Sequence, residues 1–417
     1  MKSLLNMYFC IRISNQALMD FFRFEITPIE IVGYTMFLLL AMLTVFPWLR
    51  RRNSIVGKVT SMPLEAEAPQ PTTPLSVVVI AHANDYEEVE TTIPLLMSQH
   101  YGEYEVIVVN VDESELVDNA LTRLSLTHPS LRTTFIPGSS SNVSKRKLAI
   151  TLGVKAARYP AVVITSAHSR PGSDHWLRSF GRHFDAGADV VIGYTHPDYT
   201  TDKSQGHRYR AFDGVADASR YLAAAIHHKA FRGNGNNIAY RTSAFFEMKG
   251  FSSALNLKYG DDDIFISQLA KRYRVEAELS AESILEDHIY DYERLYRNEK
   301  EHRYFTLSHT AARITFMSVL HNAVYYLYLL CAVGGVAYPI WFYYNGGEME
   351  KTITLASATA IVVAVATTIF ICSYRRISRA LSAPRLLFSL PFLYFVRPMI
   401  NAYLKLKSSR AGNYTWE

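Results

Sequence analysis

The middle of the chain contains the stretch Tyr159-Pro-Ala-Val-Val-Ile-Thr-Ser-Ala-His-Ser-Arg-Pro-Gly-Ser-Asp-His-Trp-Leu177. Its apolar, β-branched run at 161–164 predicts a buried strand, and the polar run at 165–170 follows at that strand's carboxyl end. Ligands of open α/β sheets bind at the carboxyl edge of the strands, so we expect the chemistry at this polar tip. A metal-bound phosphate would favour carboxylates there, whereas the tip offers Ser166 and His168.

Strands and helices alternate on both sides of this stretch. Short apolar runs predict further strands at 75–81, 104–109, 131–136 and 188–192. Between and after them, patterned segments predict helices at 86–99, 114–126 and 144–157, near Trp176, and at 206–229. This alternation is typical of an α/β domain with a mostly parallel sheet and right-handed crossovers.

Composition indicates a membrane protein. The chain has 417 residues, 49% of them hydrophobic, and a net charge of +5. The basic residues gather beside long apolar runs, which favours a membrane surface over nucleic acid as the partner. Cys10, Cys331 and Cys372 are isolated in the sequence, so they predict neither a disulfide framework nor a zinc site.

The first apolar run follows a weakly patterned N-terminal segment at 1–25. Residues 26–49 are long enough to span a bilayer as a helix, with Glu30 as the only charge. Three arginines follow at 50–52, and the positive-inside rule places that end in the cytoplasm. Residues 50–74 form a basic flank and a linker that holds four prolines. The folded domain then occupies 75–304.

Two more apolar runs follow that domain. Residues 305–344 predict a connecting helix and a transmembrane helix, and 352–373 predict another. Arginines after the second run place its end in the cytoplasm, so the loop at Glu348 lies outside. In the basic segment 374–417 we expect an interfacial or re-entrant helix at 386–406, with Arg397 snorkelling to the headgroups.

A second polar block lies within the folded domain. A Gly/Asn-rich loop at 232–237 can bring its backbone close to a ligand. Asp261, Asp262 and Asp263 then stand together just ahead of an apolar helix. Helix starts favour one or two acidic residues, so three are more than capping requires; capping alone is the less favoured alternative.

The chain from Leu75 to about Tyr304 resembles the membrane-bound branch of the family 2 inverting glycosyltransferases, which have the GT-A fold. Six stretches carry the resemblance, in the family's order: Leu75-Ser-Val-Val-Val-Ile-Ala-His-Ala-Asn84, Tyr104-Glu-Val-Ile-Val-Val-Asn110, Ser144-Lys-Arg-Lys-Leu-Ala149 with Gly153, Thr165-Ser-Ala-His168 in place of Asp-x-Asp, Gly233-Asn-Gly-Asn-Asn-Ile-Ala-Tyr-Arg241, and Gly260-Asp-Asp-Asp263. A seventh, Glu299-Lys-Glu-His-Arg303, lies where the family has Gln-x-x-Arg-Trp.

The resemblance implies transfer of a sugar from a nucleotide-sugar donor to a lipid-linked or polysaccharide acceptor of the cell envelope. It assigns the catalytic base to Asp262, with Asp261 and Asp263 as orienting neighbours, since the acceptor hydroxyl must lose a proton as it attacks. It implies donor contacts at Ala81, His82, Asn84, Asp112, Lys147, Ser166 and His168. It implies acceptor-side residues at Gly233, Gly235, Asn237, Arg241, His302 and Arg303.

The chain also departs from the family pattern. Ser166 and His168 replace both aspartates of the metal motif, and Val111 stands where an Asp commonly follows the second strand, with Asp112 one residue along. Beside a serine, His168 is a weak candidate metal ligand, so we expect at most a weak dependence on Mg²⁺ or Mn²⁺. A protonated His168, or the basic residues at 145–147, could offset phosphate charge instead. The alternatives are a loop histidine without a role and a solvated helix face.

Two functions follow from these patterns. An active transferase is favoured by the 233–241 loop and the acidic residues at 261–263, and an inactive glycosyltransferase-fold scaffold by Ser166, His168 and the degenerate motif at 299–303. We expect an integral protein of the bacterial inner membrane with its catalytic domain in the cytoplasm. Its expected partners are the lipid bilayer and the acceptor, and we expect no nucleic acid.

Overall fold

The computed structural model describes residues 26–62, 69–137, 144–200, 206–289, 291–307 and 312–410. The N-terminal segment 1–25 and part of the predicted linker lie outside the described residues, as do the last seven residues of the chain. Contacts divide the chain into two compact units. Unit 1 comprises Met1–Pro47 and Ser318–Phe370, and unit 2 comprises Trp48–Met317 and Ile371–Glu417.

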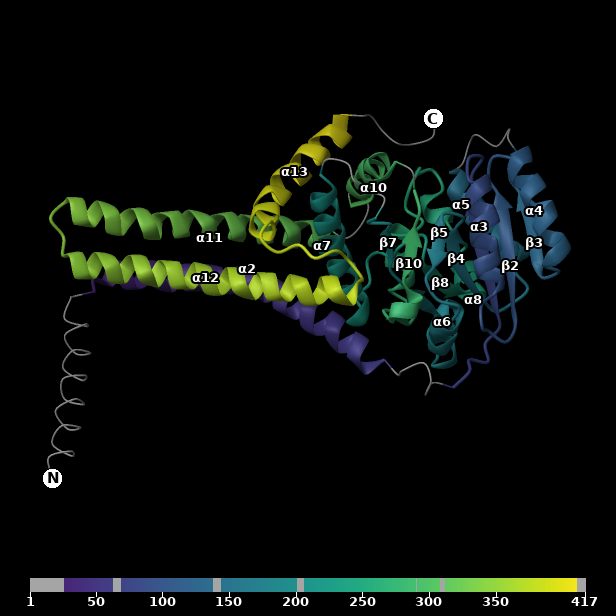
Figure 1. Cartoon of the computed structure of the whole chain (residues 1–417), viewed down its shortest axis with the longest axis horizontal. Helices are drawn as coiled ribbons and strands as arrows, with labels where there is room; N and C mark the ends of the chain where they lie inside the picture. The colour runs from purple at the N-terminus through teal and green to yellow at the C-terminus, as the bar shows by residue number, and fades with distance from the viewer. Residues whose placement is uncertain are drawn as a thin grey trace, which may run out of the picture. The chain divides into compact units, whose positions relative to one another are not determined.

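Unit 2 contains a seven-stranded sheet with the strand order β3-β2-β1-β4-β8-β6-β9 (Figure 1). The strands are β1 (Leu75–Ala81), β2 (Tyr104–Asn110), β3 (Leu131–Phe135), β4 (Ala161–Ser166), β6 (Val190–Ile192), β8 (Ile238–Arg241) and β9 (Val275–Ala277). The predicted α/β class with a mostly parallel sheet is confirmed. The exception is β8, which is antiparallel to β4 and β6 because it leaves the carboxyl edge and runs back along β4.

The helices of unit 2 include the five that the sequence predicts between residues 86 and 229, near their expected positions. They are α3 (Tyr86–Met97), α4 (Glu115–Thr127), α5 (Lys145–Ala156), α6 (Trp176–Asp185), α7 (His207–Ile226), α8 (Thr242–Glu247), α9 (Ile264–Leu269), α10 (Tyr292–Leu307) and α13 (Leu390–Arg410). A second, three-stranded sheet has the order β5-β10-β7, with β5 (Ser169–Pro171), β7 (Thr195–Pro197) and β10 (Leu285–Asp287). Single 3-10 turns occur at Ser252–Ala254 and Ala281–Ser283.

The central strands are continuous apolar runs because both faces of the sheet are covered. Every residue of β1 and β4 is buried, as expected for strands covered on both faces. Val77 and Val79 pack toward side chains of α3, α4 and α6, among them Phe180. Val78 points to the other face, where α5 approaches so closely that a Cβ on Gly153 would lie 2.2 Å from the Cγ1 of Val78. Gly153 therefore sets the distance between α5 and the sheet.

Three of the described helices are long and apolar enough to cross a membrane: α2 (Pro28–Ser61), α11 (Ala312–Tyr344) and α12 (Met349–Ala380). One precedes the sheet in the chain and two follow it. Figure 1 shows α11 and α12 side by side, joined by a short connection. In unit 1, Tyr34 of α2 donates a hydrogen bond to the carbonyl of Leu355 at 2.8 Å, and Glu30 pairs with Lys351 at 3.0 Å. Helix α2 continues past the predicted end at Leu49.

Helix α13 corrects one expectation from the sequence. Arg397 does not snorkel toward headgroups: its Nε lies 2.7 Å from Asp213 Oδ1 and its Nη2 lies 2.6 Å from Asp217 Oδ1. Helix α13 packs on α7, which carries both aspartates, and on α10 (Figure 1). The charge of Arg397 is therefore balanced inside unit 2. The interfacial placement of α13 stays a prediction.

Candidate functional site

The strand pairing brings the polar tips of β1, β2 and β4 together. Ala81, the last residue of β1, is level with Asn110 of β2, and Ile80 is level with Ser166 of β4. The chain leaves all three strands at this edge, where the Ala81 carbonyl accepts a hydrogen bond from the amide of Val111 at 2.9 Å. This is the edge at which ligands of such sheets bind.

Asp112 organises the tips of β1 and β2. Its Oδ1 accepts a hydrogen bond from Lys145 Nζ at 2.7 Å, and its Oδ2 accepts one from the amide of Ala83 at 3.2 Å. His82 Nδ1 lies 3.4 Å from the same Oδ2. Burial works to raise the pKa of Asp112, but these partners outweigh it and hold the pKa below its ordinary value. Asp112 is therefore an ionised group beside the candidate donor residue His82, while Asn84 is exposed on the same loop.

Ser166 and His168 form a neutral pair at the tip of β4. The Ser166 hydroxyl and His168 Nδ1 are 2.8 Å apart. Burial and the neighbouring charge of Arg146 lower the pKa of His168 to about 3. The imidazole is therefore neutral at pH 7 in the chain without a ligand, which disfavours the alternative in which a protonated His168 offsets phosphate charge.

Arg146 links the separate motifs of the sequence. From α5 its Nε donates to Asp261 Oδ2 at 2.7 Å, and its Nη2 donates to the carbonyl of Gly235 at 2.7 Å and to Asn236 Oδ1 at 3.1 Å. The side-chain Nδ2 of Asn236 in turn lies 3.4 Å from His168 Nε2. The basic helix, the acidic turn, the Gly/Asn loop and the tip of β4 thus meet in one place.

The acidic turn holds two carboxyl groups whose pKa values are shifted in opposite directions. Burial works to raise the pKa of Asp262, but a hydrogen bond from Asp263 and the charges of Arg232 and Arg146 outweigh it, so that pKa is lowered. Burial and the adjacent charge of Asp262 raise the pKa of Asp263 well above its ordinary value. The two adjacent pKa values are therefore driven apart, and Asp262 is the more readily ionised carboxyl of the pair. The hydroxyl of Thr306 on α10 donates to Asp263 Oδ2.

Two glycines let the loop after Arg232 approach this turn. The amide of Gly233 donates to the carbonyl of Asp262 at 2.7 Å. A Cβ on Gly235 would lie 2.8 Å from Nη2 of Arg146 and 3.4 Å from Cβ of Asp262. A side chain at position 235 would therefore displace Arg146 from the acidic turn.

Two residues expected on the acceptor side, His302 and Arg303, lie on α10. The ring of His302 stacks on Tyr259 with centroids 3.5 Å apart, and burial lowers the pKa of His302 to about 4. Arg303 instead pairs with Asp217 at 2.7 Å and with Glu299 at 3.0 Å. The charge of Arg303 helps to lower the pKa of Asp262, and its ion pair with Asp217 holds α10 in position.

Three expected site residues have structural contacts that leave them outside the cluster. Lys147 is buried and donates to the carbonyls of Ala254, Leu257 and Tyr259 at 2.6–2.7 Å, so its three hydrogens hold the segment that leads into the acidic turn. Burial lowers its pKa to about 8.

The other two are Asn237 and Arg241. The Asn237 amide donates to the carbonyls of Tyr194 and Ser283, both at 2.8 Å. Arg241 is level with Ala161, the first residue of β4, and so lies at the opposite edge of the sheet.

One residue of the site had no signal in the sequence. Asp287 is the last residue of β10. Its Oδ1 accepts a hydrogen bond from the Ser169 hydroxyl, and its Oδ2 lies 3.5 Å from the side-chain Nδ2 of Asn236. Burial raises its pKa to about 7. A lone aspartate in a three-residue strand has no pattern to mark it. Its place next to Asn236 and His168 appears only when the second sheet is known.

The tip of β4 is a poor match for the divalent cation that the resemblance implies. The described residues there offer the Ser166 hydroxyl, the His168 imidazole, the Asn236 amide and the single carboxylate of Asp287, which Ser169 already engages. Mg²⁺ prefers several oxygen ligands, carboxylates above all. These side chains therefore do not fit a Mg²⁺–diphosphate complex, and the proposed chemistry contains no step through a metal.

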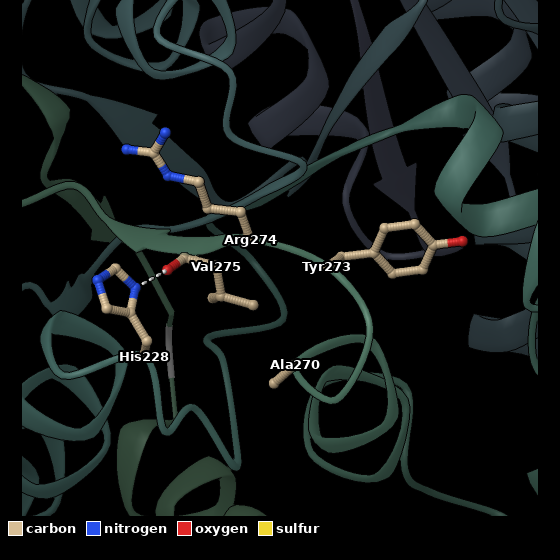
Figure 2. A pocket seen from close by; sticks show the side chains of 5 residues that line it. All are labelled: His228, Ala270, Tyr273, Arg274 and Val275. Carbon is tan, nitrogen blue, oxygen red and sulfur yellow. Dashed lines mark hydrogen bonds between the residues drawn. The ribbon is translucent and has the colours of Figure 1, made fainter.

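A cavity of about 350 Å³ lies apart from this cluster. Figure 2 shows its lining: His228, Ala270, Tyr273, Arg274 and Val275, with His228 Nδ1 3.3 Å from the carbonyl of Val275. None of these residues belongs to the acidic turn, the Gly/Asn loop or the strand tips.

Comparisons with known proteins give only distant likenesses. No family model and no curated protein sequence matches the chain. Among solved structures, the mannosyltransferase PcManGT from Pyrobaculum calidifontis, in complex with GDP-Man and Mn²⁺, covers 83% of this chain and 98% of its own at 17% identity, with a TM-score of 0.47. The S. aureus protein TarS, as its segment 1–349, covers 82% of this chain and 92% of its own at 13% identity, with a TM-score of 0.38. At these scores neither likeness bears on the chemistry of this chain.

Proposed function

We propose that this chain is a membrane-bound inverting glycosyltransferase. It would move a sugar from a nucleotide-sugar donor to a hydroxyl of a lipid-linked or polysaccharide acceptor. The observation that carries the proposal is the acidic turn. Asp262, whose pKa is lowered, adjoins Asp263, whose pKa is raised, and Arg146 and Asn236 tie this turn to the tip of β4.

The proposed chemistry follows from this arrangement. The acceptor oxygen attacks the anomeric carbon while Asp262 takes the hydroxyl proton. The bond from that carbon to the diphosphate oxygen breaks, and its electron pair leaves with the phosphate. Asp263, which accepts a hydrogen bond from the Thr306 hydroxyl, is the orienting neighbour of Asp262. A single in-line displacement inverts the anomeric centre, since no covalent sugar–enzyme intermediate forms.

Fixed cations would offset the charge that builds on the leaving diphosphate. Arg146 is held by Asp261 at 2.7 Å, and Lys145 by Asp112 at 2.7 Å, so both side chains are placed before a donor binds. Preorganised charge of this kind stabilises a transition state without reorganising during the reaction. This supports a donor site that works with little metal.

The membrane part of the proposal rests on α2, α11 and α12, which are long and apolar enough to cross a bilayer. Arginines at 50–52, 375 and 376 follow the apolar parts of α2 and α12. We infer three spans and a cytoplasmic unit 2 with access to cytosolic nucleotide sugars.

A second function, an inactive scaffold of the same fold, is favoured by Ser166 and His168 in place of carboxylates. Donor turnover by the purified full-length chain in detergent separates the two. UDP-, GDP-, CDP- and ADP-sugars would be screened for nucleotide release, with EDTA, Mg²⁺ or Mn²⁺. An active transferase releases nucleotide from at least one donor, also in EDTA. Binding of a nucleotide without release under any condition would favour the scaffold.

A further inference from the structure

Two loops far apart in the sequence are joined on the surface of unit 2. The loop after α3 meets the loop before α6, where the amide of His100 donates to the carbonyl of Asp174 at 2.7 Å. Gln99, only 6% exposed, fastens the two loops: its Nε2 donates to the carbonyl of Ser173 at 3.0 Å, and its Oε1 accepts from the amide of Leu177 at 3.2 Å. The relative position of the two loops is therefore built into the fold.

These loops bring three metal-binding side chains together. His100 Nδ1 lies 3.2 Å from Asp174 Oδ2, and His175 Nε2 lies 3.4 Å from Asp174 Oδ1. One ligand atom from each of the three residues falls within 4.8 Å of the other two. In the described part of the chain, this is the one group of three or more His, Cys, Asp or Glu side chains with such spacing.

We propose that His100, Asp174 and His175 form a Zn²⁺ site. Ligands about 2.1 Å from a tetrahedral ion are about 3.4 Å from one another, close to the separations from Asp174 to both imidazoles. Two imidazoles and one carboxylate suit Zn²⁺ and neighbouring transition metals, whereas Mg²⁺ and Ca²⁺ prefer oxygen ligands. The fourth position is left to water, and the His100 side chain, 64% exposed, gives the ion a path from solvent.

A bound ion would stabilise the start of α6. His175 directly precedes Trp176, the first residue of that helix. The buried indole of Trp176 donates from Nε1 to Asn237 Oδ1 at 3.1 Å, and Asn237 ends the Gly/Asn loop of the candidate functional site. The ion therefore fastens the loop after α3 to α6, the helix whose Trp176 contacts the Gly/Asn loop. Because it binds only the folded chain in this geometry, it raises the unfolding temperature.

The test uses the untagged full-length chain in detergent and the metal alone, and it needs no enzymatic activity. Zn²⁺ binding is measured by competition with a chromophoric chelator, and Co²⁺ is added separately to detect the visible absorption of a tetrahedral site. The variants are His100→Ala and Asp174→Asn, both at exposed side chains, and the control is His128→Ala on the loop after α4. Thermal unfolding with and without Zn²⁺ shows that each variant folds.

We expect wild type and His128→Ala to bind one Zn²⁺ and to unfold at a higher temperature with it. His100→Ala and Asp174→Asn should bind at least tenfold more weakly and lose the Zn²⁺-dependent rise while unfolding normally without metal. Equal Zn²⁺ affinity in wild type and His100→Ala would overturn the site. So would a wild type that binds no Zn²⁺, which would leave the three side chains as close neighbours without an ion.

Discussion

Asp287 is a buried carboxyl group whose pKa lies near 7, against an ordinary value of 3.8. Burial is the main cause, and the hydrogen bond from Ser169 offsets only part of it. Between about pH 4 and pH 7 the folded chain holds a proton that the unfolded chain has released. This group therefore lowers the free energy of unfolding as the pH rises through that window.

We expect Asp287→Asn to remove this contribution, because an amide has the shape of the neutral carboxyl and no charge to bury. The variant should match wild type near pH 4 and exceed its stability at pH 8 by on the order of a few kcal/mol. Thermal unfolding from pH 4 to pH 8 measures the difference, with exposed Asp118→Asn as the control. A difference that does not grow with pH would contradict the buried, proton-holding Asp287.

The tip of β4 gives a prediction about metals. Because Ser166 and His168 supply a hydroxyl and a neutral imidazole, we expect at most weak stimulation by Mg²⁺ or Mn²⁺. The double variant Ser166→Asp/His168→Asp should bind its donor more tightly in Mg²⁺ than in EDTA, as measured by calorimetry. A wild-type enzyme silenced by EDTA would show that other residues hold a metal.

The sequence marks some site residues and misplaces others for physical reasons. The acidic turn could be singled out because three adjacent carboxylates before a helix exceed what capping needs, whereas Asp262 within it is named only by the resemblance. Lys147 and Arg241 occupy motif positions, but side-chain direction and strand register decide what they contact. Lys147 donates to buried carbonyls, and Arg241 lies at the far edge of the sheet. Asp287 becomes visible only through tertiary pairing with Ser169.

At the scale of elements, β1, β2 and β4 were predictable because they are buried runs of six or seven residues. Strands β5, β7, β9 and β10 have three residues each, too few for a period, and exist only through pairing. Helix α2 runs past the arginines at 50–52 because charge ends a membrane span without ending a helix.

A buried ion cluster joins α7, α10 and α13. Asp213 and Asp217 of α7 contact Lys300 of α10 and Arg397 of α13, with Arg397 11% exposed and Asp213 fully buried. Burial works to raise the pKa of Asp217, but Lys300 and Arg397 outweigh it and hold that pKa well below its ordinary value. Lys300 and Arg303 contact the Oδ2 atoms, so removing Arg397 leaves Oδ1 of both aspartates without its donor.

We therefore expect Arg397→Met to destabilise unit 2 by roughly 3 kcal/mol or more, since one partner of a buried pair is lost. Arg397→Lys should recover part of this, and exposed Arg376→Met should cost little. Thermal unfolding in detergent compares the three. If Arg397→Met unfolds like Arg376→Met, the cluster does not fasten α13.

For the whole molecule, the arginine pattern predicts topology. Arginines follow the apolar parts of α2 and α12, and Glu348 stands in the connection between α11 and α12. In a variant lacking Cys10, Cys331 and Cys372, a membrane-impermeant thiol reagent added to intact cells should label Glu348→Cys. It should not label Ser125→Cys or Lys407→Cys, both at exposed positions.

Each labelling result has a clear meaning. Labelling of Ser125→Cys would put unit 2 on the wrong side of the membrane, away from cytosolic nucleotide sugars. Labelling of Lys407→Cys without labelling of Ser125→Cys would make α13 a fourth span rather than an interfacial helix. Permeabilised cells provide the control, because all three cysteines should then react.

The configuration of the product tests the central claim most directly. The anomeric proton of the transferred sugar would be followed by NMR during turnover of the donor found by screening, with wild type, Asp262→Asn and the control Asp118→Asn. The account predicts an inverted product from wild type and the control. It predicts a rate lower by a factor of about 10² to 10⁴ for Asp262→Asn, with nucleotide binding intact. A retained anomeric configuration, or an Asp262→Asn variant as fast as wild type, would contradict direct attack assisted by Asp262.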